Sequence, residues 1–175
     1  PFDLVIFGGT GDLARRKILP GLFRRFLAGQ MPEDARVIGC ARGDLTDTAY
    51  RKMIKEAIEE FTPKTIRKAK DVSAFVNHLH YVKVDALGTS GWKDLKAHMR
   101  DGVIRAFYFS VGPSLFGALA ERLHSYKIAD SDSRIVVEKP FGRDLASAKE
   151  LNATLAEHFD ETQIYRIDHY LGKET

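Results

Sequence analysis

The chain has 175 residues, of which 44% are hydrophobic and 29% are charged. This length suits one domain with a sizeable core, because domains usually hold about 100–200 residues. The composition is that of an ordinary folded protein and argues against a disordered or membrane-spanning chain. The formal net charge is only +3, with acids and bases interspersed, so we expect neither a nucleic-acid surface nor a membrane partner.

The sequence contains one cysteine, Cys40. A single cysteine forms no disulfide within the chain, and the N-terminus shows no signal-like apolar segment, so we expect a cytoplasmic protein. Cys40 lies in the apolar run 37–41, which predicts a small core residue rather than a nucleophile. The chain begins directly in a strand pattern and stops at Thr175 without closing an element. We therefore expect the intact protein to continue.

Short β-branched and aromatic runs alternate with longer segments of helical period along the whole chain. This alternation is typical of a parallel sheet wrapped by helices. We predict an α/β fold with a doubly wound, mainly parallel sheet of six strands and helices on both faces. The strands are predicted at residues 4–7, 37–41, 81–84, 105–110, 134–138 and 163–166.

Apolar residues at helical spacing follow the first predicted strand: Leu19, Leu22, Phe23, Phe26 and Leu27. This stripe is expected to pack on the sheet, with Arg24 and Arg25 facing solvent. Pro20 lacks an N–H group, so we predict a kink or break there. A second helix is predicted over residues 48–61, and residues 62–71 are expected to connect two helices.

The first strand runs directly into a glycine-rich loop, for which we predict coenzyme contacts from Gly8, Gly9, Thr10, Gly11, Asp12 and Leu13. Residues 9–14 fit the dinucleotide fingerprint G-x-G-x-x-G/A. Gly9 is expected to permit the tight turn, and Gly11 to let the backbone approach a diphosphate. Small Ala14 should let the helix pack closely on the strand. The helix N-terminus then offers unpaired N–H groups and a partial positive charge to an anion. The loop thus predicts a Rossmann-like dinucleotide site.

Two other interpretations of this loop exist. It can be a plain strand-to-helix turn without a ligand, although its position after the first of six strands favours nucleotide binding. A P-loop of the ATPase type is disfavoured, because Gly11 is not followed by the Lys-Ser/Thr pair that holds the terminal phosphates and magnesium.

The end of the second strand indicates which dinucleotide is bound. NAD sites usually carry an acidic residue there, but this chain carries Arg42. A planar guanidinium makes forked contacts with a 2′-phosphate and stacks on adenine, so Arg42 favours NADP. The Thr10 hydroxyl can contact the same phosphate. The alternative is that Arg42 merely caps a surface loop.

Three further segments follow predicted strands, at residues 109–113, 138–142 and 166–173. Ligands of a doubly wound sheet bind at the carboxyl ends of its strands, so all three are expected to line one cleft. Ser110 and Pro113 lie in the first segment, whose small residues would let a nicotinamide ring lie flat. Taken alone, this segment is an ordinary turn.

Lys139 stands between Glu138 and Pro140, so we expect it to be held in place at a strand end; the alternative is a surface lysine. Residues 168–173 then combine an acid, an imidazole, a phenol and an amine, from Asp168, His169, Tyr170 and Lys173. This set suits an anionic sugar phosphate and an acid–base step. The spacing supports no metal site. The other histidines are predicted to be ordinary surface or packed residues in helices or strands: His78, His80, His98, His124 and His158.

Three motifs of this chain resemble, in order, the signatures of the glucose-6-phosphate dehydrogenase family. They are residues 8–17 with the glycine loop and its basic extension, residues 138–142, and residues 166–174. The third motif is the most specific. The resemblance makes residues 1–175 the NADP-binding domain of that family, and the larger second domain is absent from this chain.

The resemblance implies that the intact protein oxidises glucose 6-phosphate at C1 to 6-phosphogluconolactone, with hydride transfer to NADP, in the pentose phosphate pathway. It implies substrate contacts for Lys17, Lys139, His169, Tyr170 and Lys173. Lys139 would also lie at the coenzyme and the reacting centre. Asp168 matches the carboxylate that orients the catalytic histidine. That histidine belongs to the second domain, so the chain alone is expected to be inactive, and homo-oligomers are expected to form through the missing domain.

Gly43 follows Arg42 where many family members carry a polar side chain, so use of both NAD and NADP stays open. Oxidoreductases related to glucose–fructose oxidoreductase and inositol dehydrogenase also pair such a domain with a Glu-Lys-Pro turn, but residues 166–174 count against them. A nucleotide-sensing module without catalysis is the remaining alternative.

Overall fold

The computed structural model describes residues 1–138 and 145–167. It forms one six-stranded sheet in the order β3-β2-β1-β4-β5-β6, and every neighbouring pair of strands is parallel. The strands are β1 (Phe2–Phe7), β2 (Arg36–Ala41), β3 (Leu79–Lys83), β4 (Ile104–Phe109), β5 (Arg134–Glu138) and β6 (Ile164–Ile167). The predicted fold class is confirmed.

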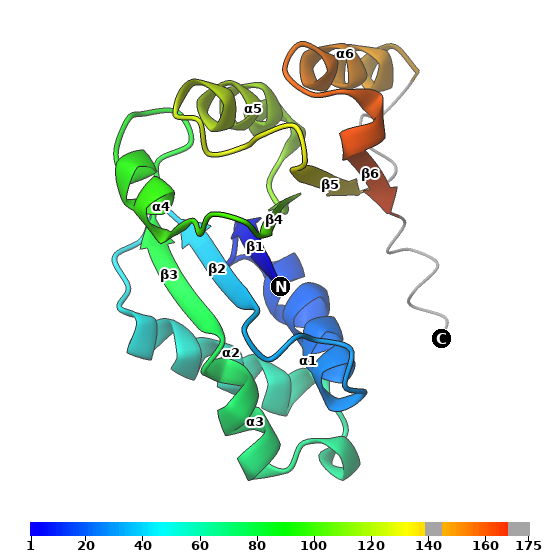
Figure 1. The fold of residues 1–175 in the computed structure, drawn as a ribbon. Helices are drawn as coiled ribbons and strands as arrows, with labels where there is room; N and C mark the ends of the chain where they lie inside the picture. The colour runs from blue at the N-terminus through cyan, green and yellow to red at the C-terminus, as the bar shows by residue number, and fades with distance from the viewer. Residues whose placement is uncertain (139–144, 168–175) are drawn as a thin grey trace.

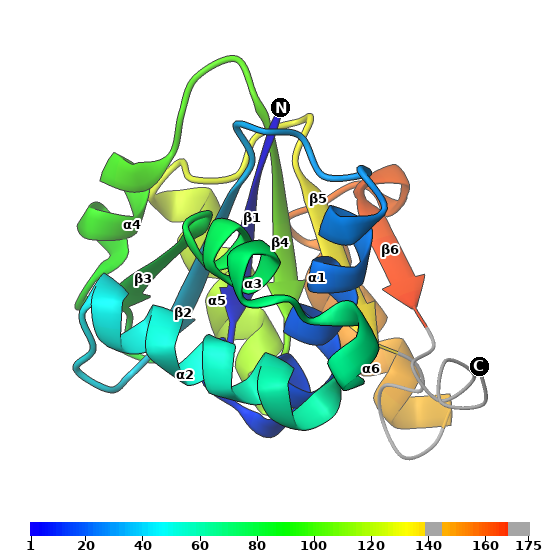
Figure 2. The same cartoon turned by 90° about the horizontal axis from the view of Figure 1, so that it is seen from below.

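Helices cover both faces of the sheet, as Figures 1 and 2 show. Helices α1 (Leu19–Leu27), α2 (Asp47–Phe61) and α3 (Ala69–Val76) pack on one face. Helices α4 (Trp92–His98), α5 (Phe116–Ser125) and α6 (Leu145–Ala156) pack on the other. The helices change face between β1 and β4, which are neighbours in the sheet although distant in the sequence. This position is the topological switch point of the fold.

Side chains of β1 alternate between the two cores because successive residues of a strand point to opposite faces. Val5 and Phe7 belong to the core beneath α4 and α5, whereas Leu4 and Ile6 belong to the core beneath α1 and α2. All four side chains are buried. Burial on both faces explains why this strand reads as a continuous apolar run.

The helix after β1 changes its winding at the predicted position. A π-helical segment, Ala14–Ile18, precedes α1, and Pro20 lies in the first turn of α1. The Leu19 N–H group donates to the Ala14 carbonyl five residues back. Pro20 has no N–H group to continue the α-helical pattern, so the hydrogen bonding shifts here. The predicted break at Pro20 is confirmed.

Several sequence-based details differ from the structure. Helix α1 ends at Leu27, which is exposed rather than packed on the sheet, because it lies in the final turn beyond the core. Residues 62–71 do connect two helices, with a short 3-10 turn at Lys64–Ile66, but α3 begins within them at Ala69. His78 and His158 lie in turns rather than in helices or strands.

The amino end of the sheet contains a fully buried carboxylate. The Asp3 side chain has 0% of its surface exposed, and its Oδ1 accepts hydrogen bonds from Arg100 Nη2 at 2.7 Å and Nε at 3.0 Å. The Arg100 backbone N–H also donates to Asp3 Oδ2, at 3.2 Å. This pair ties β1 to the segment that precedes β4.

Replacing Asp3 with asparagine should lower the free energy of unfolding by about 1.5 kcal/mol, because the ionised acceptor becomes a neutral amide while the charge of Arg100 stays in place. Urea denaturation measures this change. The matched control is Asp44→Asn, since Asp44 and Lys83 are both exposed and their charged atoms lie 3.0 Å apart. Exposed pairs of this kind contribute about 0–1 kcal/mol, so equal effects of the two variants would contradict a stabilising role for the buried pair.

Within the described residues, no helix combines the length and apolar character needed to cross a membrane.

Candidate coenzyme site

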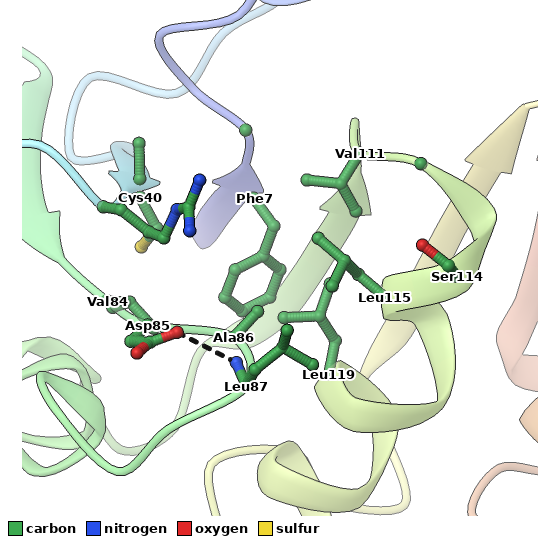
Figure 3. Close-up of a pocket in the computed structure, with 14 residues that line it drawn as sticks. Phe7, Cys40, Val84, Asp85, Ala86, Leu87, Val111, Ser114, Leu115 and Leu119 are labelled. Atoms are coloured by element: carbon green, nitrogen blue, oxygen red, sulfur yellow. Dashed lines mark hydrogen bonds between the residues drawn. The ribbon is translucent and has the colours of Figure 1, made fainter.

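A cleft of about 480 Å³ opens at the carboxyl ends of β1, β2, β3 and β4, at the switch point of the sheet. It is lined by Phe7, Gly8, Cys40, Ala41, Arg42, Val84, Asp85, Ala86, Leu87, Val111, Gly112, Ser114, Leu115 and Leu119. Figure 3 shows the Phe7 ring between Cys40 on one side and Leu119 on the other. The inner wall is therefore apolar, and the polar groups belong to the loops at the rim.

The turn that leaves β1 depends on Gly8. Its φ angle is +82°, and a Cβ atom there would lie 2.1 Å from the carbonyl oxygen of Ser110. The N–H groups of Gly8 and Gly9 both donate to the Cys40 carbonyl, at 2.9 and 3.1 Å. Only glycine fits both the left-handed backbone and the contact with β4. The sequence predicts the tight turn at Gly9, but the structure places the positive φ angle at Gly8.

Gly9 is instead required by the approach of the loop to β2 and α2. A Cβ atom on Gly9 would lie 2.7 Å from the Gly39 Cα atom and 3.0 Å from the Tyr50 hydroxyl oxygen. The Tyr50 hydroxyl donates to the Gly9 carbonyl at 2.9 Å. Tyr50 was not identified from the sequence, although the isolated Gly39 within a strand is the type of signal that marks such a close approach.

The segment after the loop starts the helical region as predicted. Ala14 is fully buried in the core beneath α1 and α2, which confirms the close packing expected from a small side chain. The Gly11 N–H group donates to Gly8 O at 2.9 Å, closing the turn. Asp12 is exposed and pairs with Arg16 at 3.0 Å, and Arg15 donates to the Thr10 carbonyl.

Arg42 lies at the carboxyl end of β2, on the rim of the cleft. Its side chain is exposed, and no hydrogen bond or ion pair joins it to another side chain in the part of the chain that the structure describes. The neighbouring carboxylate of Asp44 is paired with Lys83 at 3.0 Å. The guanidinium group therefore remains available to an anion in the cleft.

The loop after β3 forms the opposite rim, and sequence reasoning did not identify it. Asp85 Oδ1 accepts from the Leu87 N–H group at 3.1 Å, as the dashed line in Figure 3 shows. Arg122 of α5 donates to the carbonyls of Leu87 and Gly88, at 2.9 and 2.7 Å. Leu87 is 67% exposed. The loop that Arg122 fixes therefore presents an apolar side chain at the cleft.

A family model described as glucose-6-phosphate dehydrogenase, NAD binding domain, matches residues 5–175. The chain belongs to this family. It is similar over its whole length to glucose-6-phosphate 1-dehydrogenase of Rhizobium meliloti, at 49% identity, and to that of Gluconobacter oxydans, at 44% identity. The chain spans 36% and 37% of these two relatives.

Solved structures give the same result. The enzyme of Mycobacterium avium matches 98% of this chain with a TM-score of 0.89 and 34% identity. A glucose-6-phosphate dehydrogenase in complex with its substrate glucose-6-phosphate matches with a TM-score of 0.86 and 31% identity. The chain covers 37% of each. The predicted resemblance to the glucose-6-phosphate dehydrogenase family is thus confirmed.

Cys40 lines the apolar inner wall of the cleft. Its side chain is buried, and burial raises the pKa of the thiol far above its ordinary value. A thiol in that state stays protonated and is a poor nucleophile. The prediction of a small packed residue is confirmed.

The segment after β4 reaches the cleft through residues adjacent to those predicted. Val111, Gly112 and Ser114 line it, whereas Ser110 and Pro113 do not. The Ser110 hydroxyl oxygen is buried and has no partner among the described residues. Its N–H group donates to the Phe7 carbonyl at 3.0 Å and so joins the ends of β1 and β4.

Lys17 is the one predicted substrate residue within the described part of the chain. It lies in the π-helical segment and is half-buried. Lys139, Asp168, His169, Tyr170 and Lys173 fall outside the described residues. Glu138, at the end of β5, is half-buried, and burial raises the pKa of its carboxyl group. The structure therefore describes all the predicted coenzyme residues except Lys139, but only Lys17 of the predicted substrate residues.

Proposed function

We propose that this domain binds NADP and, in a longer protein, presents it for the oxidation of glucose 6-phosphate at C1 to 6-phosphogluconolactone. The observation that carries the proposal is the glycine turn at Gly8, which opens onto a cleft with Arg42 on its rim. The family match and the names of the relatives support the reaction.

The diphosphate of the coenzyme would lie over residues 9–12. The side chains of Arg15 and Arg16 are engaged with Thr10 and Asp12, and the residues at 8, 9 and 11 have no side chain beyond hydrogen. Backbone N–H groups at the start of the helical region then favour an anion. Thr10, in the same loop, would offer its hydroxyl group to the 2′-phosphate.

The adenosine part of NADP would lie between the rims formed after β2 and β3. Arg42 would contact the 2′-phosphate in a charge-assisted, forked geometry. Leu87 and Ala86 offer apolar surface to the adenine ring from the other rim. No acidic residue ends β2, where NAD sites usually carry one.

The bound nicotinamide supplies the hydride acceptor, and the chain binds and orients the two reactants. Val111 and Gly112 would border the ring. We propose that Lys17 and Lys139 contact the sugar, that His169, Tyr170 and Lys173 bind its phosphate, and that Asp168 orients a histidine. Held in this way, C1 would be kept near the nicotinamide, and fixed proximity of this kind lowers a reaction barrier.

The general base belongs, in this proposal, to a second domain, as do the surfaces for homo-oligomers. The relatives are almost three times as long as this chain, which leaves room for such a domain. We further propose that the whole protein acts in the cytoplasm within the pentose phosphate pathway.

Calorimetric titration of the 175-residue chain with NADP and NAD tests the proposal. We expect saturable binding with one site per chain, tighter for NADP, and no formation of NADPH when glucose 6-phosphate is added. Absence of heat with both nucleotides would remove the coenzyme site. Substrate-dependent NADPH formation by the chain alone would instead show that the base does not lie in a second domain.

A further inference from the structure

Two tyrosines lie on the face of the sheet opposite the apolar wall of the cleft, and each donates a hydrogen bond to one loop at the carboxyl end of the sheet. The Tyr50 hydroxyl, from α2, donates to the Gly9 carbonyl at 2.9 Å. The Tyr81 hydroxyl, from β3, donates to the Gly43 carbonyl at 2.6 Å. The first loop is the proposed diphosphate loop, and the second carries Arg42. Each bond joins residues about forty positions apart in the sequence.

The two rings support each other. Their centroids lie 5.4 Å apart at an angle of 41°. Tyr50 is fully buried, and its ring covers Gly39 so closely that a Cβ atom there would lie 2.4 Å from the ring. Burial raises the pKa of both hydroxyl groups. Both therefore keep their protons at neutral pH and remain donors.

Tyr81 is itself fixed at its backbone. It pairs with Gly39 in the sheet, and its N–H group donates to Asp47 Oδ1 at 2.8 Å. Asp47 begins α2, the helix that carries Tyr50. The Tyr81 hydroxyl is thus held at a defined position relative to both the sheet and α2.

The loop that Tyr81 contacts has few other restraints. Gly43 follows Arg42 directly, and a Cβ atom at Gly43 would meet nothing within 4 Å. The nearby pair of Lys83 and Asp44 is exposed, and such pairs stabilise little. The Val84 N–H group donates to the Ala41 carbonyl at 2.9 Å and extends the strand pairing just before the loop. Beyond that point, the Tyr81 hydroxyl holds the loop next to Arg42, and the partly buried side chain of Leu45 packs against the core.

We propose that Tyr81 is a positioning residue for coenzyme specificity: its bond to Gly43 holds the backbone next to Arg42, so that the guanidinium group is ready for a 2′-phosphate. Tyr50 acts in the same way on the diphosphate loop, which NADP and NAD use equally. This inference rests on the proposed NADP site. The inference gives the two hydroxyl groups different roles: loss of the Tyr81 hydroxyl should affect NADP alone, whereas loss of the Tyr50 hydroxyl should affect NADP and NAD alike.

The test compares Tyr81→Phe with Tyr50→Phe, using the dissociation constants of NADP and NAD on the same protein samples. Loss of one neutral hydrogen bond costs about 0.5–1.5 kcal/mol, which corresponds to about 2–12-fold in affinity. We expect Tyr81→Phe to weaken NADP by about that factor and to leave NAD unchanged. Tyr50→Phe should weaken both coenzymes by a similar factor. The control is Tyr126→Phe, because Tyr126 stacks on Trp92 away from both loops, and it should change neither.

A double-mutant cycle with Arg42→Ala sharpens the result. If Tyr81 acts through Arg42, Tyr81→Phe should have no further effect on NADP once Arg42 is removed. Equal loss of NADP and NAD in Tyr81→Phe, no loss of either, or full additivity with Arg42→Ala would overturn the inference. Partial unfolding does not imitate the expected result, since it lowers the amount of competent protein for both coenzymes equally. If the unaltered chain binds neither coenzyme, the proposed function fails instead.

Discussion

Replacing Gly8 with alanine is expected to abolish coenzyme binding and to lower the free energy of unfolding by about 3 kcal/mol. The backbone there has a φ angle of +82°, which costs an L-residue about 1–2 kcal/mol. In addition, the new Cβ atom would lie 2.1 Å from the Ser110 carbonyl oxygen. That oxygen belongs to the backbone after β4, so the clash is relieved only if the loop moves. Movement of the loop takes the N–H groups away from the diphosphate.

Urea denaturation and calorimetric titration with NADP measure the two effects. The matched control is Gly43→Ala, because a Cβ atom at Gly43 meets no other atom within 4 Å and its φ angle is not in the left-handed region. Gly43→Ala should change the free energy of unfolding by no more than about 0.5 kcal/mol, as surface substitutions usually do. Its dissociation constant for NADP should stay within about twofold of that of the unaltered chain. If Gly8→Ala still binds NADP with unchanged affinity, the diphosphate does not lie on this turn.

Replacing Arg42 with alanine should weaken NADP binding by about 30-fold and leave NAD binding nearly unchanged. Hydrogen bonds to charged groups contribute about 1.5–3 kcal/mol, and each 1.4 kcal/mol is a factor of ten. Arg42 forms no ion pair with another described residue that would have to be broken, and its removal leaves no buried group unsatisfied. The expected loss therefore comes from the 2′-phosphate alone, which NAD lacks.

The change is measured as the ratio of the NADP and NAD dissociation constants. Arg24→Ala is the control, since Arg24 is an exposed arginine on α1 and carries the same charge far from the rim. Raising the salt concentration should weaken NADP binding less in Arg42→Ala than in the unaltered chain, because one ionic contact is gone. Equal losses for NADP and NAD would show that Arg42 does not recognise the 2′-phosphate.

The two ends of the sheet are held by different kinds of contact. At the amino end of the sheet, the buried pair of Asp3 and Arg100 joins two segments without any ligand. At the carboxyl end, side chains bond to loop carbonyls, as Tyr50, Tyr81 and Arg122 do. Since the anchors lie in helices and strands, the loops at the rim are held by the rigid part of the domain.

The sequence predicted the centre of the sheet well because β1 and β2, which are buried on both faces, read as continuous apolar runs. The predicted strand at residues 134–138 agrees with β5 at both ends, while the third begins two residues earlier than predicted, at Leu79. The break at Pro20 was also predictable, because a missing N–H group acts locally. Leu27 was mispredicted, since helical spacing does not show where the sheet beneath a helix ends.

The sequence was enough to predict the fold class, the place of the glycine loop, the cation at the end of the second strand and the family. These features depend on residue types close together in the chain. Only the tertiary structure showed that Gly8 rather than Gly9 makes the turn, that the Ser110 carbonyl just after β4 lies against Gly8, and that Tyr50 and Tyr81 anchor the two loops. Such contacts join residues tens of positions apart, and a local sequence pattern does not show to which distant carbonyl a hydroxyl group donates.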